Sequence, residues 1–288
     1  MHFRPILKWP GGKSWVAERL SEILACELQG TYYEPFLGGA AVCLALNPKH
    51  AVLSDTNSDL IDFYNCIVAN PERVVAAARR FRNTADVYYR VRASCPRTDI
   101  ARAGRFLYLN KTCWGGIYRI NKEGSFNVPY GQGGRKICCG ADILNFAHAS
   151  LGFTFESQDF EYSFDKAAKG DVLFADPPYT SKGQFNGFLR YNEKLFSWSD
   201  QERLASCAHR AKRKGVFVAV CGSYHRDFLA LYEGWWAAPV QRNSLVASRV
   251  SARREIWECV LFSRFPKSST LSVNRINRDL LLSIPHHE

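Results

Sequence analysis

The pattern of apolar and polar residues along the chain alternates between two periods. Apolar residues recur every three or four positions, as in amphipathic helices, over 14–28, 56–70 and 199–214. Short apolar runs, as in buried strands, occupy 31–35, 50–55, 171–175 and 214–223. Strands and helices that alternate in this way favour a parallel sheet with helices on its faces, so we expect a doubly wound α/β fold.

The middle of the chain breaks this alternation. Residues 60–145 are helical in pattern and basic, and then become glycine-rich and irregular toward their end. Strand-like alternation resumes after them. We therefore expect one α/β domain built from residues 1–59 and 146–270, a basic and mostly helical insertion over 60–145, and a polar C-terminal appendage over 271–288.

The composition is that of a globular protein that works away from membranes. Of the 288 residues 47% are hydrophobic and 23% are charged, and no apolar run approaches the length of a bilayer-crossing helix. The chain does not open like a signal peptide, so we expect a cytoplasmic protein, and also a monomer. The ten cysteines lack the paired spacing of a zinc site, which favours reduced thiols and no bound metal.

The net charge of +11 is concentrated in the expected insertion. Between Arg73 and Lys122, twelve Lys and Arg residues stand against only two acids, Asp86 and Asp99. The aromatic residues interleaved with these charges are Phe81, Tyr88, Tyr89, Phe106, Tyr108, Trp114 and Tyr118. Positive charge beside stacking surface favours nucleic acid as the partner, although solvated helix faces are also often basic.

Residues 6–14 read ILKWPGGKS and end like a phosphate-binding loop. Such a loop needs Gly-x-x-x-x-Gly-Lys-Ser/Thr directly after a buried strand. Leu7 stands where the first glycine belongs, and the few residues before it leave little room for a strand. The sequence therefore disfavours a nucleotide triphosphatase.

The tetrapeptide DPPY follows directly on an apolar run that we expect to be a strand. In open α/β sheets, ligands bind at the carboxyl ends of the strands. The Asp176 carboxylate and the Pro177 carbonyl can each accept one N–H of an exocyclic amine, which aims the nitrogen lone pair at an electrophile. Pro178 keeps the backbone rigid, and Tyr179 can stack on the base that carries the amine. A Pro-rich turn before a helix explains the motif alone equally well.

A second candidate site is the turn EPFLGG, which begins at Glu34. A glycine turn between a strand and a helix lets a ligand approach the backbone. Asp55, an acid expected to end the next strand, can hold ribose hydroxyl groups. This arrangement suits a cofactor that contains adenosine, although a buried turn and a capping aspartate are the simpler interpretation of these residues alone.

Together these segments resemble the DNA adenine N6-methyltransferases of the Dam-like group. The matching segments, in the order of that family, are KWPGGK (8–13), EPFLGGAAV (34–42), LSDTNSDLIDFYN (53–65), FLYLNKTCWGGIYRINKEGSFNVPYG (106–131), DVLFADPPY (171–179) and VAVCGS (218–223). The resemblance implies a Rossmann-like methyltransferase sheet and S-adenosyl-L-methionine as cofactor. It also implies transfer of a methyl group to N6 of an adenine that is flipped out of double-stranded DNA.

The resemblance assigns roles to particular residues. The cofactor-binding residues that it implies are Trp9, Lys13, Glu34, Phe36, Gly38, Asp55, Asp159, Phe160 and Asp176. The catalytic residues that it implies are Asp176, Pro177, Pro178 and Tyr179. Ala40 departs from the pattern, because the family often has a glycine there, and we expect it to narrow the pocket slightly without abolishing binding.

For target reading, the resemblance points to the segment CWGGIYRIN. Arg119 matches an arginine that reads guanine, whose O6 and N7 a guanidinium group can bind together. Ile117 would touch a thymine methyl group and Trp114 would fill the stack left by the flipped base, although core packing explains these two nearly as well. We therefore expect a GATC-like site.

Two alternatives to this function remain at the level of the sequence. Cytosine N4-methylation presents the same amine to a similar tetrapeptide, although serine is more usual there than Asp176. An inactive DNA-binding protein could also share the scaffold. The sequence leaves open whether the methylation serves restriction-modification, a phage or housekeeping.

Overall fold

The computed structural model describes residues 5–121, 124–131, 137, 140–180, 196–243 and 255–284. Its contacts divide the chain into two compact units, and each unit is made of two chain segments. Unit 1 comprises Met1–Glu18 and Leu37–Gln158, and unit 2 comprises Arg19–Phe36 and Asp159–Glu288. The domain boundaries expected from the sequence stay a prediction.

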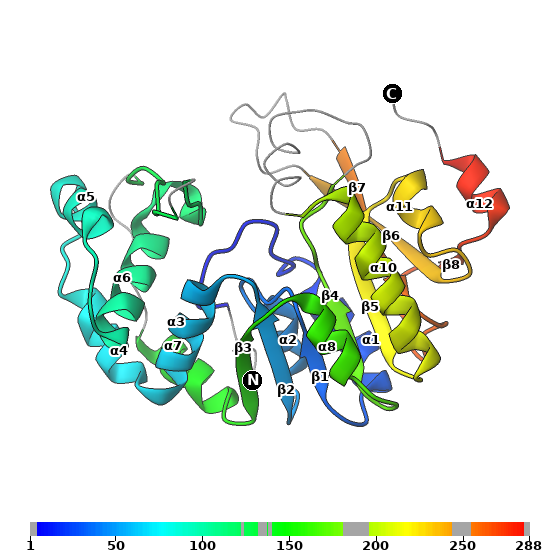
Figure 1. The fold of residues 1–288 in the computed structure, drawn as a ribbon, viewed down its shortest axis with the longest axis horizontal. Coiled ribbons are helices and arrows are strands. Elements are labelled where there is room, and N and C mark those ends of the chain that lie inside the picture. The colour runs from blue at the N-terminus through cyan, green and yellow to red at the C-terminus, as the bar shows by residue number, and fades with distance from the viewer. Residues whose placement is uncertain are drawn as a thin grey trace. The chain divides into compact units, whose positions relative to one another are not determined.

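Unit 1 carries a group of helices between its two strands. β2 (Ala51–Asp55) and β3 (Phe153–Ser157) pair in parallel. α2 (Ala41–Leu46) precedes β2. The described helices between β2 and β3 are, in chain order, α3 (Ser58–Ala69), α4 (Pro71–Arg79), α5 (Ala85–Ala93), α6 (Asp99–Thr112), the short 3-10 helix η1 (Trp114–Gly116) and α7 (Gly140–Ala149). The chain between β2 and β3 is thus mostly helical, as the sequence predicts (Figure 1).

Local sequence signals determine where these helices begin and how closely they pack. Asn57 caps α3 and Thr98 caps α6, because each side chain accepts a backbone N–H of the first turn. Pro71 occupies the start of α4, where its missing N–H is tolerated. A Cβ on Gly104 of α6 would lie 2.6 Å from the Cβ of Ala77, so the close packing of α4 on α6 requires a glycine there.

Six strands lie among the described residues of unit 2. They are β1 (Tyr32–Glu34), β4 (Val172–Ala175), β5 (Phe217–Ser223), β6 (Trp236–Asn243), β7 (Glu255–Phe262) and β8 (Asn274–Arg275). β1, β4 and β5 are parallel neighbours, whereas β7, β6 and β8 continue the sheet in antiparallel fashion. In unit 1 β3 neighbours β2, and in unit 2 the strand order is β1-β4-β5-β7-β6-β8, so the expected α/β fold class is confirmed.

The helices of unit 2 pack on its strands and on one another. They are α1 (Ala17–Glu27), which begins in the last residues of the first segment of unit 1, α8 (Phe160–Lys166), α10 (Trp198–Arg213), α11 (Arg226–Ala230) and α12 (Arg278–Ser283). α10 contacts both α8 and β5, and it begins with a capping box between Ser197 and Asp200. None of the described helices is long and apolar enough to cross a membrane.

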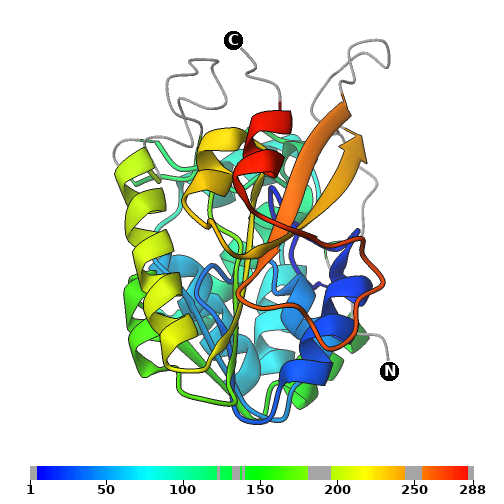
Figure 2. The ribbon, with the colours of Figure 1, turned by 90° about the vertical axis from the view of Figure 1, so that its right-hand side faces the viewer.

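The middle of the sheet is apolar on both faces. Every residue of β4 is buried, and so is β5 as far as Gly222, which confirms the two strands predicted from apolar runs. The pairing of β6 with β7, visible as the two long arrows in Figure 2, is not predicted by the sequence. Pro239 in β6 argues against a strand, because proline has no backbone N–H to donate to a neighbouring strand. However, β8 pairs only with the first residues of β6, so no hydrogen bond to β8 is lost at Pro239.

Candidate active site and target-reading hairpin

The carboxyl ends of β1 and β4 bring two of the predicted segments together in unit 2. The two strands are parallel neighbours, with Tyr33 opposite Leu173. Glu34 therefore ends β1 beside the end of β4, which Asp176 directly follows. Parallel neighbours from distant parts of the chain leave their ends open to a ligand, because each connection runs away from the other.

The DPPY segment is held in place from two other elements of unit 2. The side chain of Gln201 in α10 donates from Nε2 to the carbonyl of Pro178 over 3.2 Å. The hydroxyl of Tyr179 lies 3.1 Å from Oε2 of Glu258 in β7 and 3.4 Å from Oδ1 of Asp176. Burial raises the pKa of the Tyr179 hydroxyl well above its usual value, and the Asp176 carboxylate raises it further. The phenol therefore keeps its proton at neutral pH.

Phe36 and Phe160, both predicted near the cofactor, contact each other in unit 2. Their rings stack with centroids 5.5 Å apart, and Phe196 meets Phe36 edge-on at 5.5 Å. Phe160 is buried and Phe36 is partly exposed. Phe196 was not a candidate from the sequence, because it is distant along the chain and no motif marks it.

Asp159 and Glu34 make close polar contacts inside unit 2. Asp159 caps α8 and binds Arg203 through both carboxylate oxygens, at 2.7 and 2.9 Å. The hydrogen bonds from Arg203 hold the pKa of this carboxyl below its usual value. Glu34 is buried and accepts a hydrogen bond from the hydroxyl of Tyr32 at 2.8 Å. The structure thus gives both acids a clear packing role, and their contact with a cofactor stays a prediction.

The glycine turn and Asp55 form a compact arrangement in unit 1. Gly38 has a φ of +47°, and its N–H donates to Oδ2 of Asp55 at 3.2 Å. Oδ1 of Asp55 accepts the N–H of Asn57 at 3.0 Å. Burial raises the pKa of the Asp55 carboxyl, while these backbone hydrogen bonds lower it. Each carboxylate oxygen keeps further acceptor capacity, as binding of ribose hydroxyl groups would require.

Trp9 and Lys13 lie on the segment that precedes α1, and Trp9 packs against this turn. A Cβ on Gly38 would come within 2.7 Å of Cδ1 of Trp9, so the indole packs directly against the glycine. Lys13 is buried, and its Nζ donates to the carbonyl of Gly11 at 2.9 Å. Trp9 thus contacts the predicted cofactor turn, which the sequence could not show.

A phosphate loop and a metal site have no counterpart in the part of the chain that the structure describes. Residues 5–16 contain no strand, although a phosphate loop must follow one. Nowhere do three or more His, Cys, Asp or Glu side chains of the described residues come together as metal ligands. The cysteines found as free thiols are Cys26, Cys43, Cys66, Cys95, Cys113, Cys207, Cys221 and Cys259.

The predicted target-reading segment folds as an irregular hairpin of unit 1, residues 113–130. Isolated bridges join Cys113 to Tyr130 and Ile120 to Phe126. Trp114 is 60% exposed, which excludes the core-packing interpretation for this residue. Ile117 is half-buried.

Arg119 lies near the tip of this hairpin and is exposed. Its Nε donates to Oδ1 of Asn127 at 2.8 Å, and among the described residues its terminal nitrogens have no hydrogen-bond partner. A guanidinium group that is oriented through Nε can still present both terminal nitrogens to one acceptor pair. The hairpin is therefore suited to bidentate recognition.

The helix α6 and the hairpin that follows it each contact the segment around Trp9 inside unit 1, which sequence reasoning missed. Asn110, at the end of α6, accepts the N–H of Lys8 at 3.0 Å and donates to its carbonyl at 2.8 Å. The ring of Tyr118 stacks on Trp9 with centroids 5.2 Å apart. Only the tertiary fold reveals such contacts, because about a hundred residues separate the partners.

Three of the seven aromatic residues between the basic charges are buried core residues, which corrects the expectation that all of them offer stacking surface. Tyr88 and Tyr108 are fully buried, and Phe106 is 9% exposed. Tyr88 and Tyr108 belong to the apolar cluster that joins α5, α6 and the hairpin. Tyr89 and Trp114 remain exposed. The pattern of aromatic residues in this region therefore reports helix packing more than nucleic-acid contact.

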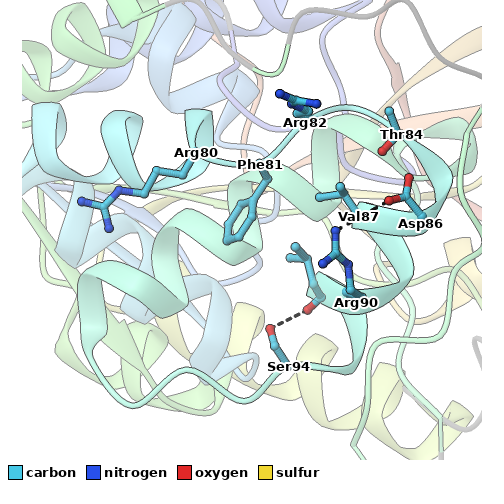
Figure 3. A pocket seen from close by; sticks show the side chains of 9 residues that line it. Arg80, Phe81, Arg82, Thr84, Asp86, Val87, Arg90 and Ser94 are labelled. Atoms are coloured by element: carbon cyan, nitrogen blue, oxygen red, sulfur yellow. Dashed lines mark hydrogen bonds and ion pairs between the residues drawn. The ribbon is translucent and has the colours of Figure 1, made fainter.

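Three arginines surround an open cavity of about 660 Å³ near the α4–α5 turn. Arg90 pairs with Asp86 at 3.6 Å, and both side chains are exposed. Figure 3 shows that Arg80 points away from Arg90, so these guanidinium groups do not converge on one position. This distribution suits separate phosphate contacts rather than one bound anion.

Known proteins resemble the chain over most of its length. The family described as D12 class N6 adenine-specific DNA methyltransferase matches residues 9–245. A type II methyltransferase of Lactococcus lactis subsp. cremoris, M1.LlaDCHI, is 29% identical over 272 residues, covering 91% of this chain and 95% of the relative. A DNA adenine methylase of Vibrio cholerae serotype O1 is 31% identical over 264 residues, covering 88% of this chain and 94% of the relative.

The family match decides between the two bases left open by the sequence, because its description specifies adenine N6 and not cytosine N4. It also covers every segment on which the resemblance rests except the first residue of KWPGGK. The glycine turn beside Asp55 is compatible with the adenosine-containing cofactor of such enzymes. The chain belongs to the D12 class of N6 adenine-specific DNA methyltransferases, which use S-adenosyl-L-methionine to methylate adenine in DNA.

Proposed function

We infer that this enzyme methylates N6 of a flipped adenine in a GATC-like duplex site. The observation that carries the catalytic part is the position of Asp176, which directly follows β4 beside the end of the parallel strand β1. The target site is a finer proposal, and it rests on Arg119 and its hydrogen bond to Asn127.

Asp176 and the Pro177 carbonyl are proposed to accept the two N–H groups of the adenine amine. We do not propose the Pro178 carbonyl as an acceptor for the amine, because it already accepts a hydrogen bond from Gln201. Two acceptors draw both hydrogens toward themselves, which localises the nitrogen lone pair and directs it away from them, so positioning supplies most of the rate enhancement. The ring of Tyr179 is proposed to stack on the adenine.

S-adenosyl-L-methionine, when bound, supplies an electrophilic methyl group on a sulfonium sulfur. From unit 1, we propose that Trp9, Lys13, Gly38 and Asp55 contact it. From unit 2, we propose that Glu34, Phe36, Asp159, Phe160 and Asp176 contact it. Asp55 would hold ribose hydroxyl groups with the acceptor capacity that Gly38 and Asn57 leave, and Gly38 would allow close approach to the backbone.

The hairpin of residues 113–130 is proposed to enter the DNA. Arg119 would bind O6 and N7 of a guanine with its terminal nitrogens. Trp114, which is 60% exposed, would occupy the space of the flipped base, and Ile117 would touch a thymine methyl group. Outside the hairpin, Arg80, Arg82 and Arg90 would contact phosphates. We further propose that the enzyme is a cytoplasmic monomer that does not bind membranes.

The site preference can be tested in a host strain that lacks adenine methylation of its own. Plasmid DNA from cells that express the enzyme should resist a nuclease blocked by N6-methylated GATC, and should be cut by one that requires it. Unmodified GATC sites together with N6-methyladenine elsewhere would contradict the site and leave the activity intact.

Arg119→Ala should lose about 1 to 3 kcal/mol of discrimination at one guanine, because the bidentate contact is gone. Arg119→Lys should fail to restore it, since a single ammonium group does not match the acceptor pair. Arg90→Ala is the matched control, and it should weaken binding to all DNA sequences alike. Equal discrimination in the Arg119 and Arg90 variants would exclude the proposed reading role.

A further inference from the structure

The hydroxyl of Tyr179 faces two carboxylates but has only one proton to donate. It lies 3.1 Å from Oε2 of Glu258 and 3.4 Å from Oδ1 of Asp176. Hydrogen bonds of this type are normally shorter than 3.0 Å, and they weaken as the distance grows. The shorter distance therefore favours donation to Glu258, and the same phenol can turn to Asp176 when Glu258 no longer accepts.

Glu258 lies on a strand of the unit 2 sheet, and its side chain contacts the DPPY segment. It lies in β7, opposite Ser223 of β5 and Val240 of β6. Its side chain is 6% exposed, although a glutamate is rarely buried without a specific partner. Seventy-nine residues separate Glu258 from Tyr179, so no local motif links the two.

We propose that Glu258 is a positioning residue that holds the Tyr179 hydroxyl away from Asp176. Asp176 then keeps its acceptor sites for the adenine amine, and the Tyr179 ring keeps the orientation needed for stacking. This role rests on the proposed reaction at Asp176.

Loss of Glu258 changes the chemistry of Asp176 in a defined way. The buried phenol keeps its proton, because its pKa is raised, and it must place that proton on some acceptor. Donation to Asp176 takes up one lone pair of the carboxylate and spreads its negative charge onto the phenol. The carboxylate then attracts the adenine N–H less strongly, so the rate of methyl transfer falls while DNA binding outside the site is unchanged.

The test compares kcat and the KM for DNA in five proteins, with radiolabelled methyl transfer as the readout. Glu258→Ala should lower kcat by about tenfold to a hundredfold, the range that corresponds to one misdirected hydrogen bond at a reacting group. Glu258→Gln should stay within about threefold of the wild type, because its amide oxygen still accepts from Tyr179. The KM for DNA should change little in both variants.

A double variant separates this role from simple damage to the fold. Tyr179→Phe removes the hydroxyl, and the ring can still stack. Added to Glu258→Ala, it should recover about tenfold of the lost kcat, because the phenol that misdirects Asp176 is gone. The control is Glu202→Ala, which removes an exposed carboxylate from α10 and should leave kcat unchanged.

The outcomes distinguish the two levels of the proposal. No methyl transfer to DNA by the wild-type enzyme would overturn the proposed function itself. An active wild type together with full activity of Glu258→Ala would overturn the role of Glu258. A double variant that is no more active than Glu258→Ala, at equal stability in urea, would also overturn it.

Discussion

Asp55, the last residue of β2, and Asp176, the first residue after β4, have different surroundings, although both come at a carboxyl end of a parallel strand. In unit 1, Asp55 accepts backbone N–H groups of Gly38 and Asn57 on its two oxygens. In unit 2, Asp176 faces the phenol of Tyr179, a side chain that also reaches Glu258. Backbone donors cannot rotate away, whereas a hydroxyl group can. We therefore propose that Asp55 holds a ligand in one place, whereas Asp176 exchanges hydrogen bonds during the reaction.

The largest effect should come from Asp176. Asp176→Ala should lower methyl transfer by at least about a thousandfold, because the adenine amine loses one of its two acceptors and its orientation. The dissociation constant for S-adenosyl-L-methionine, measured by calorimetry, should rise by less than about tenfold. Activity within tenfold of the wild type would remove Asp176 from the mechanism and end the contrast between the two acids.

A smaller effect of a different kind should come from Asp55. Asp55→Ala should raise the dissociation constant for S-adenosyl-L-methionine by about fivefold to 150-fold, since the ribose loses its acceptor and the backbone donors lose their partner. At saturating cofactor kcat should stay within about threefold of the wild type. The exposed acid Asp86 provides the control, because Asp86→Ala should change neither constant. A loss of kcat at unchanged affinity would reverse the roles assigned to the two aspartates.

The smallest effect should come from the backbone beside Asp55. Ala40 is buried and has a φ of 57°, a region that favours glycine. Ala40→Gly should raise the free energy of unfolding by about 0.5 to 1 kcal/mol and leave the affinity for cofactor unchanged. Ala45→Gly inside α2 should lower it by about 1 kcal/mol, because glycine disfavours a helix. Urea unfolding measures both, and a change of the same sign in the two variants would show that strain at Ala40 is not relieved.

Much of the central fold could be predicted from the sequence. The apolar runs that became β2, β4 and β5 are short, bounded by turns and rich in β-branched or aromatic residues. The sequence of α10 shows both the apolar spacing of an amphipathic helix and a capping box at its start. These signals are local, so tertiary contacts were not needed to read them.

The pairing of β6 with β7 and the partners of the site residues could not be predicted. Pro239 makes the β6 segment look unlike a strand in the sequence, although the pairing with β7 tolerates it. The contacts of Glu258 with Tyr179 and of Asn110 with Lys8 join distant parts of the chain. The buried ring of Tyr108 shows the opposite error, because an aromatic residue among arginines looks the same in sequence whether it packs or binds. The motifs located the site, and only the fold supplied the residues that support it.

The contact between Trp9 and Gly38 restricts how this enzyme can evolve or be redesigned. A side chain at position 38 would collide with the indole ring, and the φ of +47° adds strain for any residue other than glycine. A single substitution cannot introduce a larger side chain at position 9 or 38, so the two residues must change together in a compensating pair. Libraries that aim to admit a bulkier cofactor analogue should therefore vary both codons together, since a scan of single substitutions would miss the combinations that work.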